Sequence, residues 1–105
     1  MTHDHPIAIA GIEWDQGNRD KCQRHGVSLA EIEALFLENR VRVRPDPAHS
    51  EAEERFHAIG ATEAGRYVFL VFTLRERETG TFVRPISARY MHGKEIRRYE
   101  QQSET

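Results

Sequence analysis

The residues best suited to chemistry are a histidine and several arginines in the second half of the chain. Arg55, His57, Arg75 and Arg89 each fall in a segment with the alternating pattern of a β-strand. An imidazole can give or take a proton near neutral pH, and fixed guanidinium groups stabilise charge that develops on a reacting phosphate. These residue types suit metal-free cleavage of RNA. A base takes the 2′-hydroxyl proton, the oxygen attacks the adjacent phosphate, and an acid protonates the leaving 5′-oxygen.

The segment 86–100 supplies further positive charge. An apolar strand delivers Arg89 at its end and continues into a basic helix that contains Lys94, Arg97 and Arg98. An arginine at a strand terminus is a poor core residue, but its planar guanidinium can hold two phosphoryl oxygens at once. Arg89 and Arg55 are therefore expected to hold phosphate, and Lys94 and Arg84 are further candidates for binding substrate.

Helical patterns dominate the first half of the chain after a β-branched strand over residues 7–12. Asp15 is a plausible N-cap for a short polar helix to about residue 24. Ser28 and Glu31 have the spacing of a capping box and begin a second helix. Its apolar residues recur on one helical stripe, at Leu29, Ile32, Leu35 and Phe36.

Alternating patterns predict a sheet in the second half. Residues 41–44 are typical of a short edge strand, and residues 53–61, 67–75 and 81–89 predict three longer strands joined by short, antiparallel connections. The strand 67–75 is apolar on both faces near its start, so we expect it in the centre. Pro85 cannot donate to a ladder and indicates an edge or a bulge. With a closing helix over residues 93–101, the fold class is α+β: an N-terminal strand, two short helices, an antiparallel sheet of three to four main strands and a C-terminal helix.

Period-two alternation assigns the polar side chains to faces of this sheet. Phe56 points to one face, whereas Arg55 and His57 point to the other. On the last strand Arg89 shares a face with Ser87, and Arg84 is expected on the opposite face. If the helices cover the Phe56 face, then Arg55, His57, Arg75 and Arg89 converge on the open face. This convergence depends on the strand register, which a sequence does not show.

Composition bounds the class of protein. The chain has 105 residues, of which 38% are hydrophobic, which predicts a single domain over residues 7–102 between a disordered tail at 1–6 and a short tail at 103–105. No apolar run approaches the ~20 residues of a membrane helix, and the polar start lacks signal-peptide features, so we expect a cytoplasmic protein without membrane contact. The single cysteine, Cys22, excludes an internal disulfide and is interpreted as a small buried side chain.

Charge is distributed unevenly along the chain. Residues 1–65 hold seven Lys/Arg against twelve Asp/Glu, a net charge of −5, whereas residues 66–99 hold eight against three, a net charge of +5. This asymmetry favours one face for an anionic partner, although two ordinary solvated surfaces would give the same count. His3, Asp4 and His5 could chelate a metal, but a short flexible segment lacks supporting contacts, and no metal or cofactor is expected.

Four segments resemble the BrnT toxins of type II toxin–antitoxin systems. They are Ile12-Glu13-Trp14-Asp15, Arg24-His25-Gly26-Val27-Ser28, Glu53-Glu54-Arg55-Phe56 with Ile59-Gly60, and Ile86-Ser87-Ala88-Arg89 followed by a helix ending Arg97-Arg98-Tyr99-Glu100. The resemblance covers roughly residues 12–100. It implies a RelE-like ribonuclease fold and adds His25 as a low-ranked site residue.

The resemblance also implies partners. RNA would be the substrate, and the bound protein partner would be an antitoxin with a DNA-binding domain whose complex with the toxin binds operator DNA. A second interpretation stays open, in which the same basic face is a non-catalytic module that docks an acidic partner or nucleic acid. His57 could equally be a half-exposed histidine without a role, and Arg55 and Arg89 could pair with Glu53, Glu54 or Glu100.

Overall fold

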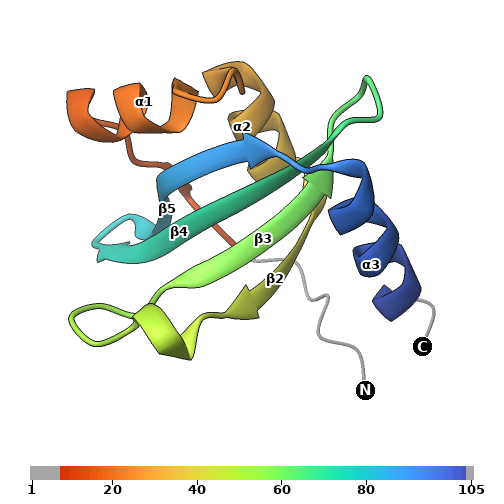
Figure 1. Ribbon diagram of the computed structural model, residues 1–105. Coiled ribbons are helices and arrows are strands. Elements are labelled where there is room, and N and C mark those ends of the chain that lie inside the picture. The colour runs from red at the N-terminus through yellow and green to blue at the C-terminus, as the bar shows by residue number, and fades with distance from the viewer. Residues whose placement is uncertain (1–7, 104–105) are drawn as a thin grey trace.

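The computed structural model describes residues 8–103 and places a twisted sheet between helices (Figure 1). The elements in chain order are β1 (Gly11–Ile12), α1 (Gln16–Gln23), α2 (Leu29–Leu37), β2 (Val41–Pro45), the 3-10 turn η1 (Pro47–His49), β3 (Phe56–Ala61), β4 (Tyr67–Arg77), β5 (Gly80–Tyr90) and α3 (Gly93–Ser103). The predicted α+β class is confirmed. The predicted tail at 1–6, with His3, Asp4 and His5, lies outside the described residues, as do residues 104–105. Ser103, which we expected in the C-terminal tail, belongs to α3.

The sheet is mixed and has five strands in the order β1-β5-β4-β3-β2. β4 is central and β2 is an edge strand, as predicted. The expected antiparallel sheet of three to four main strands was incomplete, because β1 adds a fifth strand that runs parallel to β5. β1 is only two residues long, and β5, its partner, lies far along the chain. The sequence therefore contains no hairpin signal that predicts this pairing.

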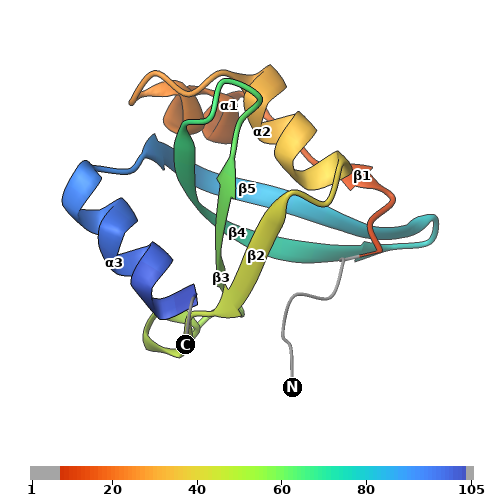
Figure 2. The ribbon, with the colours of Figure 1, turned by 90° about the vertical axis from the view of Figure 1, so that its right-hand side faces the viewer.

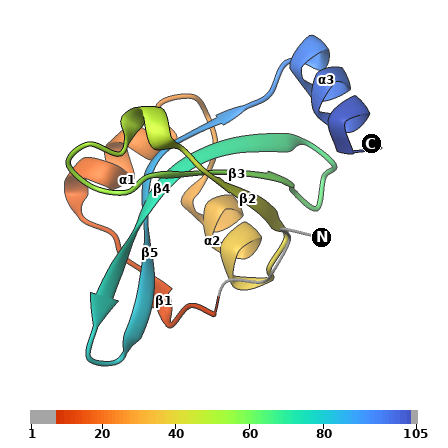
Figure 3. The same cartoon turned by 90° about the horizontal axis from the view of Figure 1, so that it is seen from below.

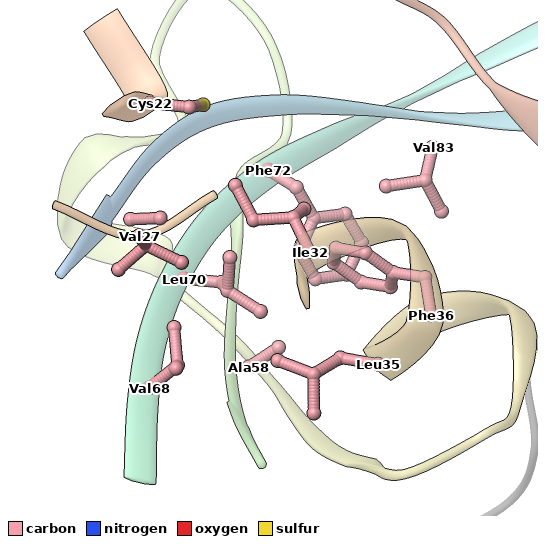
Figure 4. Packing of buried hydrophobic residues seen from close by; sticks show 11 residues of the cluster. Cys22, Val27, Ile32, Leu35, Phe36, Ala58, Val68, Leu70, Phe72 and Val83 are labelled. Atoms are coloured by element: carbon pink, nitrogen blue, oxygen red, sulfur yellow. The ribbon is translucent and has the colours of Figure 1, made fainter. Parts of the chain in front are cut away.

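One face of the sheet is buried under α1 and α2. The α2 helix starts at a complete capping box between Ser28 and Glu31, and its apolar side packs on β3 and β4 (Figure 4). The rings of Phe36 and Phe72 meet edge to face with their centroids 5.0 Å apart. Cys22 of α1 is fully buried in the same core, as expected. The helices therefore cover the Phe56 and Ala58 face, and the opposite face carries His57.

A β-bulge in β5 corrects one prediction. Val71 pairs with Ser87, but the next residue, Phe72, pairs with Pro85, so Ile86 is the extra residue on β5. An extra residue shifts the alternation that follows it by one. Arg84 pairs with Thr73 and therefore shares a face with Arg89. Strict alternation had placed Arg84 on the opposite face, which is wrong, although the irregularity at Pro85 was predicted.

Helix α3 lies over the face of the sheet that α1 and α2 leave open (Figures 2 and 3). Its residues Ile96 and Tyr99 are half-buried, whereas Arg97 and Arg98 are exposed. Tyr99 contacts Tyr67 of β4 with ring centroids 5.7 Å apart. The open face is therefore covered in part, and pockets open between α3 and the strands below it.

Gly60 of β3 lies close to α2 and to the segment that follows this helix. A methyl group at this position would overlap the carbonyl oxygen of Arg40 and would stand 3.0 Å from Leu35 Cδ2. We expect Gly60→Ala to lower the free energy of unfolding by about 1–3 kcal/mol, because the surrounding backbone must shift. Urea unfolding measures the change. Gly93→Ala is the control, since its nearest neighbour is at 3.5 Å. Equal stability of Gly60→Ala and the parent would contradict this packing.

Candidate functional site

The open face brings His57 and Arg89 to opposite sides of one aromatic ring. The register places Phe69 directly between Ile59 of β3 and Arg89 of β5. The guanidinium carbon of Arg89 lies 4.8 Å from the Phe69 ring centroid. The imidazole of His57 lies 5.0 Å from the same centroid. Strand pairing therefore brings the acid–base candidate His57 and the candidate phosphate ligand Arg89 to the same aromatic ring.

Asp46 holds His57 in place. Its carboxylate is buried, and its Oδ2 atom lies 2.9 Å from Nε2 of His57 and 3.0 Å from Nδ1 of His49. The loop is fixed by its backbone, because Asp46 N donates to the carbonyl of Arg55 at 2.9 Å. Burial alone would raise the pKa of Asp46, but the hydrogen bonds and charges of His49 and His57 outweigh it and lower the pKa below its usual value. Asp46 is thus an anion that orients His57.

Sequence reasoning missed both Asp46 and His49. Pro-Asp-Pro at residues 45–47 is a strong loop signal, and a loop signal alone does not place Asp46 in a site. A second property of this segment does point to Asp46. An aspartate between two prolines has little conformational freedom to lose when it binds a partner. What could not be read locally is that the loop folds back on β3, where His57 stands.

Arg89 engages a carboxylate of α3. Its Nη1 and Nη2 donate to Oε1 and Oε2 of Glu95 at 2.9 and 2.7 Å, in a two-point contact. Glu95 also accepts the backbone N–H of His92 at 3.1 Å, at the start of the helix. The hydrogen bond from Arg89 is the main reason that the pKa of Glu95 falls to about 2. Arg89 therefore pairs with a carboxylate, but its partner is Glu95 and not the expected Glu53, Glu54 or Glu100.

A pocket of about 280 Å³ opens between α3 and strands β2 to β4. His57 lines it from the sheet, and Glu95 lines it from the helix. Arg44 and Arg98 also line it, and within residues 8–103 neither of these two cations forms an ion pair. The other lining residues are Arg42, Ile59, Phe69, Met91, Tyr99 and Gln102. The pocket therefore combines two groups that can exchange protons with cations that can bind an anion.

Arg75 and Arg84 belong to a different cluster at the β1 end of the open face. Both approach Glu13 at 3.9 Å, and Arg84 also donates to Asp15 Oδ2 at 2.6 Å. Arg75 forms a further ion pair with Glu53. Carboxylates thus balance these two arginines, and neither lines the pocket that contains His57.

The remaining candidates lie near the pocket or far from it. Arg55 is half-buried directly before β3, and its side chain pairs with no carboxylate among the residues that the structure describes. Lys94 is exposed beside Glu95 in the first turn of α3. His25 is exposed in the turn between α1 and α2, which belongs to the layer on the other side of the sheet. The structure does not bring His25 to His57.

Two features, a cluster of metal-binding side chains and a membrane-spanning helix, are absent from the part of the chain that the structure describes. Residues 8–103 contain no group of three or more His, Cys, Asp or Glu side chains that could hold a metal ion. Over the same range, no helix has the length and apolar character needed to cross a membrane.

The contact between Arg89 and Glu95 predicts a specific response to acid. The folded-state pKa of Glu95, about 2, lies below its ordinary value of 4.5, so the contact stabilises the fold fully above about pH 4.5 and loses this effect as pH falls toward 2. We expect Glu95→Gln to be less stable than the parent at pH 6, with a difference that shrinks between pH 4.5 and 2. Urea unfolding across pH measures it, and Glu54→Gln controls for the loss of one exposed charge. A difference that stays constant down to pH 2 would contradict the assignment.

Comparison with known proteins assigns the chain to a family. Among curated proteins, no sequence matches the chain significantly. The model of the family described as the ribonuclease toxin BrnT of type II toxin-antitoxin systems matches residues 14–95. The match runs from Trp14 beside β1 to Glu95 in α3 and includes Asp46, His57 and Arg89. Because it covers well over half of the sequence, this chain belongs to the BrnT family of ribonuclease toxins of type II toxin–antitoxin systems.

Proposed function

We propose that this chain is a metal-independent endoribonuclease that acts in the cytoplasm, cleaves RNA and thereby inhibits translation. The family is described as a ribonuclease toxin, which supports ribonuclease activity in general. The observation that carries the finer proposal is His57, held through Nε2 by the buried carboxylate of Asp46 at the edge of an arginine-lined pocket. Every group that the reaction requires can then come from side chains.

His57 is the group that moves a proton. A carboxylate that accepts a hydrogen bond from one ring nitrogen fixes the orientation of an imidazole and leaves the other nitrogen for the substrate. Here Asp46 engages Nε2 at 2.9 Å, so Nδ1 is the atom that would face the reacting oxygen. Asp46 is therefore a positioning residue in this proposal, and His57 is the catalytic acid or base.

The arginines supply charge for the phosphate. Cleavage by an internal 2′-oxygen adds negative charge to the phosphoryl oxygens, and fixed cations stabilise that charge in the transition state. Arg44 and Arg98 line the pocket, Arg89 lies behind Glu95, and Arg55 precedes the strand that carries His57. Arg75 and Arg84 are balanced by carboxylates, so they rank below these four as phosphate ligands.

The antitoxin is part of the same proposal. Type II systems pair a toxin with a protein antitoxin, and an acidic surface on that protein would complement the cations of α3 and β2. We propose further that this antitoxin carries a DNA-binding domain and that the complex binds operator DNA. This last step rests on the family resemblance alone.

Expression of the chain in a host without antitoxin tests the function. We expect growth arrest and loss of intact RNA with the parent, and normal growth with His57→Ala or Arg89→Ala, because each variant lacks one group that the transition state needs. Circular dichroism checks that both variants fold. Arg24→Ala, which removes an exposed arginine beyond α1, should arrest growth like the parent.

Incubation of the purified protein with RNA separates catalysis from binding. The parent should cleave RNA in EDTA at an unchanged rate. A non-catalytic module would bind RNA with a salt-dependent affinity and leave it intact. Full toxicity of both the His57→Ala and the Arg89→Ala variant, or loss of cleavage in EDTA, would contradict the proposal.

A further inference from the structure

Glu95 has a position that the reaction outlined above does not use. Glu95 lines the pocket from α3, whereas His57 lines it from β3, so the two residues belong to elements on different sides of the pocket. Among the described residues that line this pocket, Glu95 is the only carboxylate. Cleavage through the 2′-oxygen needs two proton-transfer groups on opposite sides of the phosphate, one for the attacking oxygen and one for the leaving oxygen. The pocket contains a suitable pair.

We propose that Glu95 is the general base of the reaction and that the substrate activates it. The reacting phosphate takes the place of the Glu95 carboxylate in the guanidinium fork of Arg89, and the freed carboxylate accepts the proton of the 2′-hydroxyl. This inference rests on the proposed ribonuclease function and assigns a role within that same site.

The exchange at Arg89 is physically reasonable because the two ligands are alike. A phosphodiester presents two non-bridging oxygens with one negative charge, which matches the two-point contact that Glu95 now makes. The side chains of Arg89 and Glu95 remain 37% and 33% exposed, so solvent weakens their attraction. Arg44 and Arg98 would add positive charge around the incoming phosphate, since both line the pocket.

The exchange also solves a chemical difficulty. While Arg89 holds Glu95, the pKa of this carboxyl is about 2, and such a carboxylate is a poor base. The hydrogen bond from Arg89 is the largest cause of that low pKa. Its transfer to the phosphate raises the pKa of Glu95 at the moment when the 2′-hydroxyl arrives. The base is therefore weak in the free protein and stronger in the complex.

The proton balance of the step is complete without another reactant. The 2′-hydroxyl proton moves to a Glu95 oxygen as the O2′–P bond forms. The P–O5′ bond breaks, and protonated His57 gives its Nδ1 proton to the leaving 5′-oxygen. The products are a 2′,3′-cyclic phosphate and a 5′-hydroxyl. Exchange with water then returns both side chains to their starting protonation states.

Single-turnover cleavage of an RNA oligonucleotide, together with binding of its fully 2′-O-methylated analogue, tests the assignment. The analogue lacks the reacting hydroxyl and reports affinity alone. For Glu95→Gln we expect cleavage to slow by about a hundredfold or more, with unchanged or tighter binding of the analogue. Glutamine keeps an oxygen for the His92 N–H but no longer accepts the proton. Glu95→Asp should be faster than Glu95→Gln, and Glu100→Gln on the same helix should match the parent.

Each other outcome overturns the proposal in a distinct way. A Glu95→Gln variant that cleaves as fast as the parent, or faster, would make Glu95 a competitor of the substrate and not a base. Weaker binding of the analogue in step with slower cleavage would assign Glu95 a structural role in the binding site and not the role of a base. A parent protein that binds RNA without cleaving it would overturn the proposed function itself, and the assignment of Glu95 with it.

Discussion

The burial of one face of β4 under α2 is the constraint on which the rest of the structure depends. Val68, Leu70 and Phe72 are fully buried on that face. Because side chains alternate along a strand, Phe69 and Val71 must then face the other way. Strand pairing extends this face to β3 and β5 and presents His57 and Arg89 on either side of Phe69. A shift of the register by one residue would bury both groups and abolish the site.

Charge on the open face is organised in two ways. At the β1 end, Glu13 lies among three arginines, and the ion pairs there are between groups that are at least partly exposed. Such pairs add little stability individually, but they leave few net charges to attract an anion. At the other end, Arg44 and Arg98 face a pocket whose single lining carboxylate among the described residues is Glu95. Residues of similar type therefore differ in what they can bind because of their neighbours.

Local patterns predicted the elements well and the site in part. The capping box at Ser28, the central position of β4 and the shared face of His57 and Arg89 follow from spacing and alternation, and the structure has all three. The face of Arg84 was wrong because one bulged residue reverses alternation, and a proline predicts an irregularity but not its exact register. The roles of Asp46 and Glu95 were not predicted, because their contacts depend on how a loop and α3 fold back over the sheet. Long-range packing of this kind leaves no local period in the sequence.

The central claim is that side chains alone drive cleavage through the 2′-oxygen of RNA. Mass spectrometry of the fragments that purified protein releases from RNA in EDTA tests it most directly. The account predicts ends with a 2′,3′-cyclic phosphate, or the 3′-phosphate that forms from it, together with 5′-hydroxyl ends. Fragments with 3′-hydroxyl and 5′-phosphate ends would contradict it, because water and not the 2′-oxygen would then have attacked the phosphate.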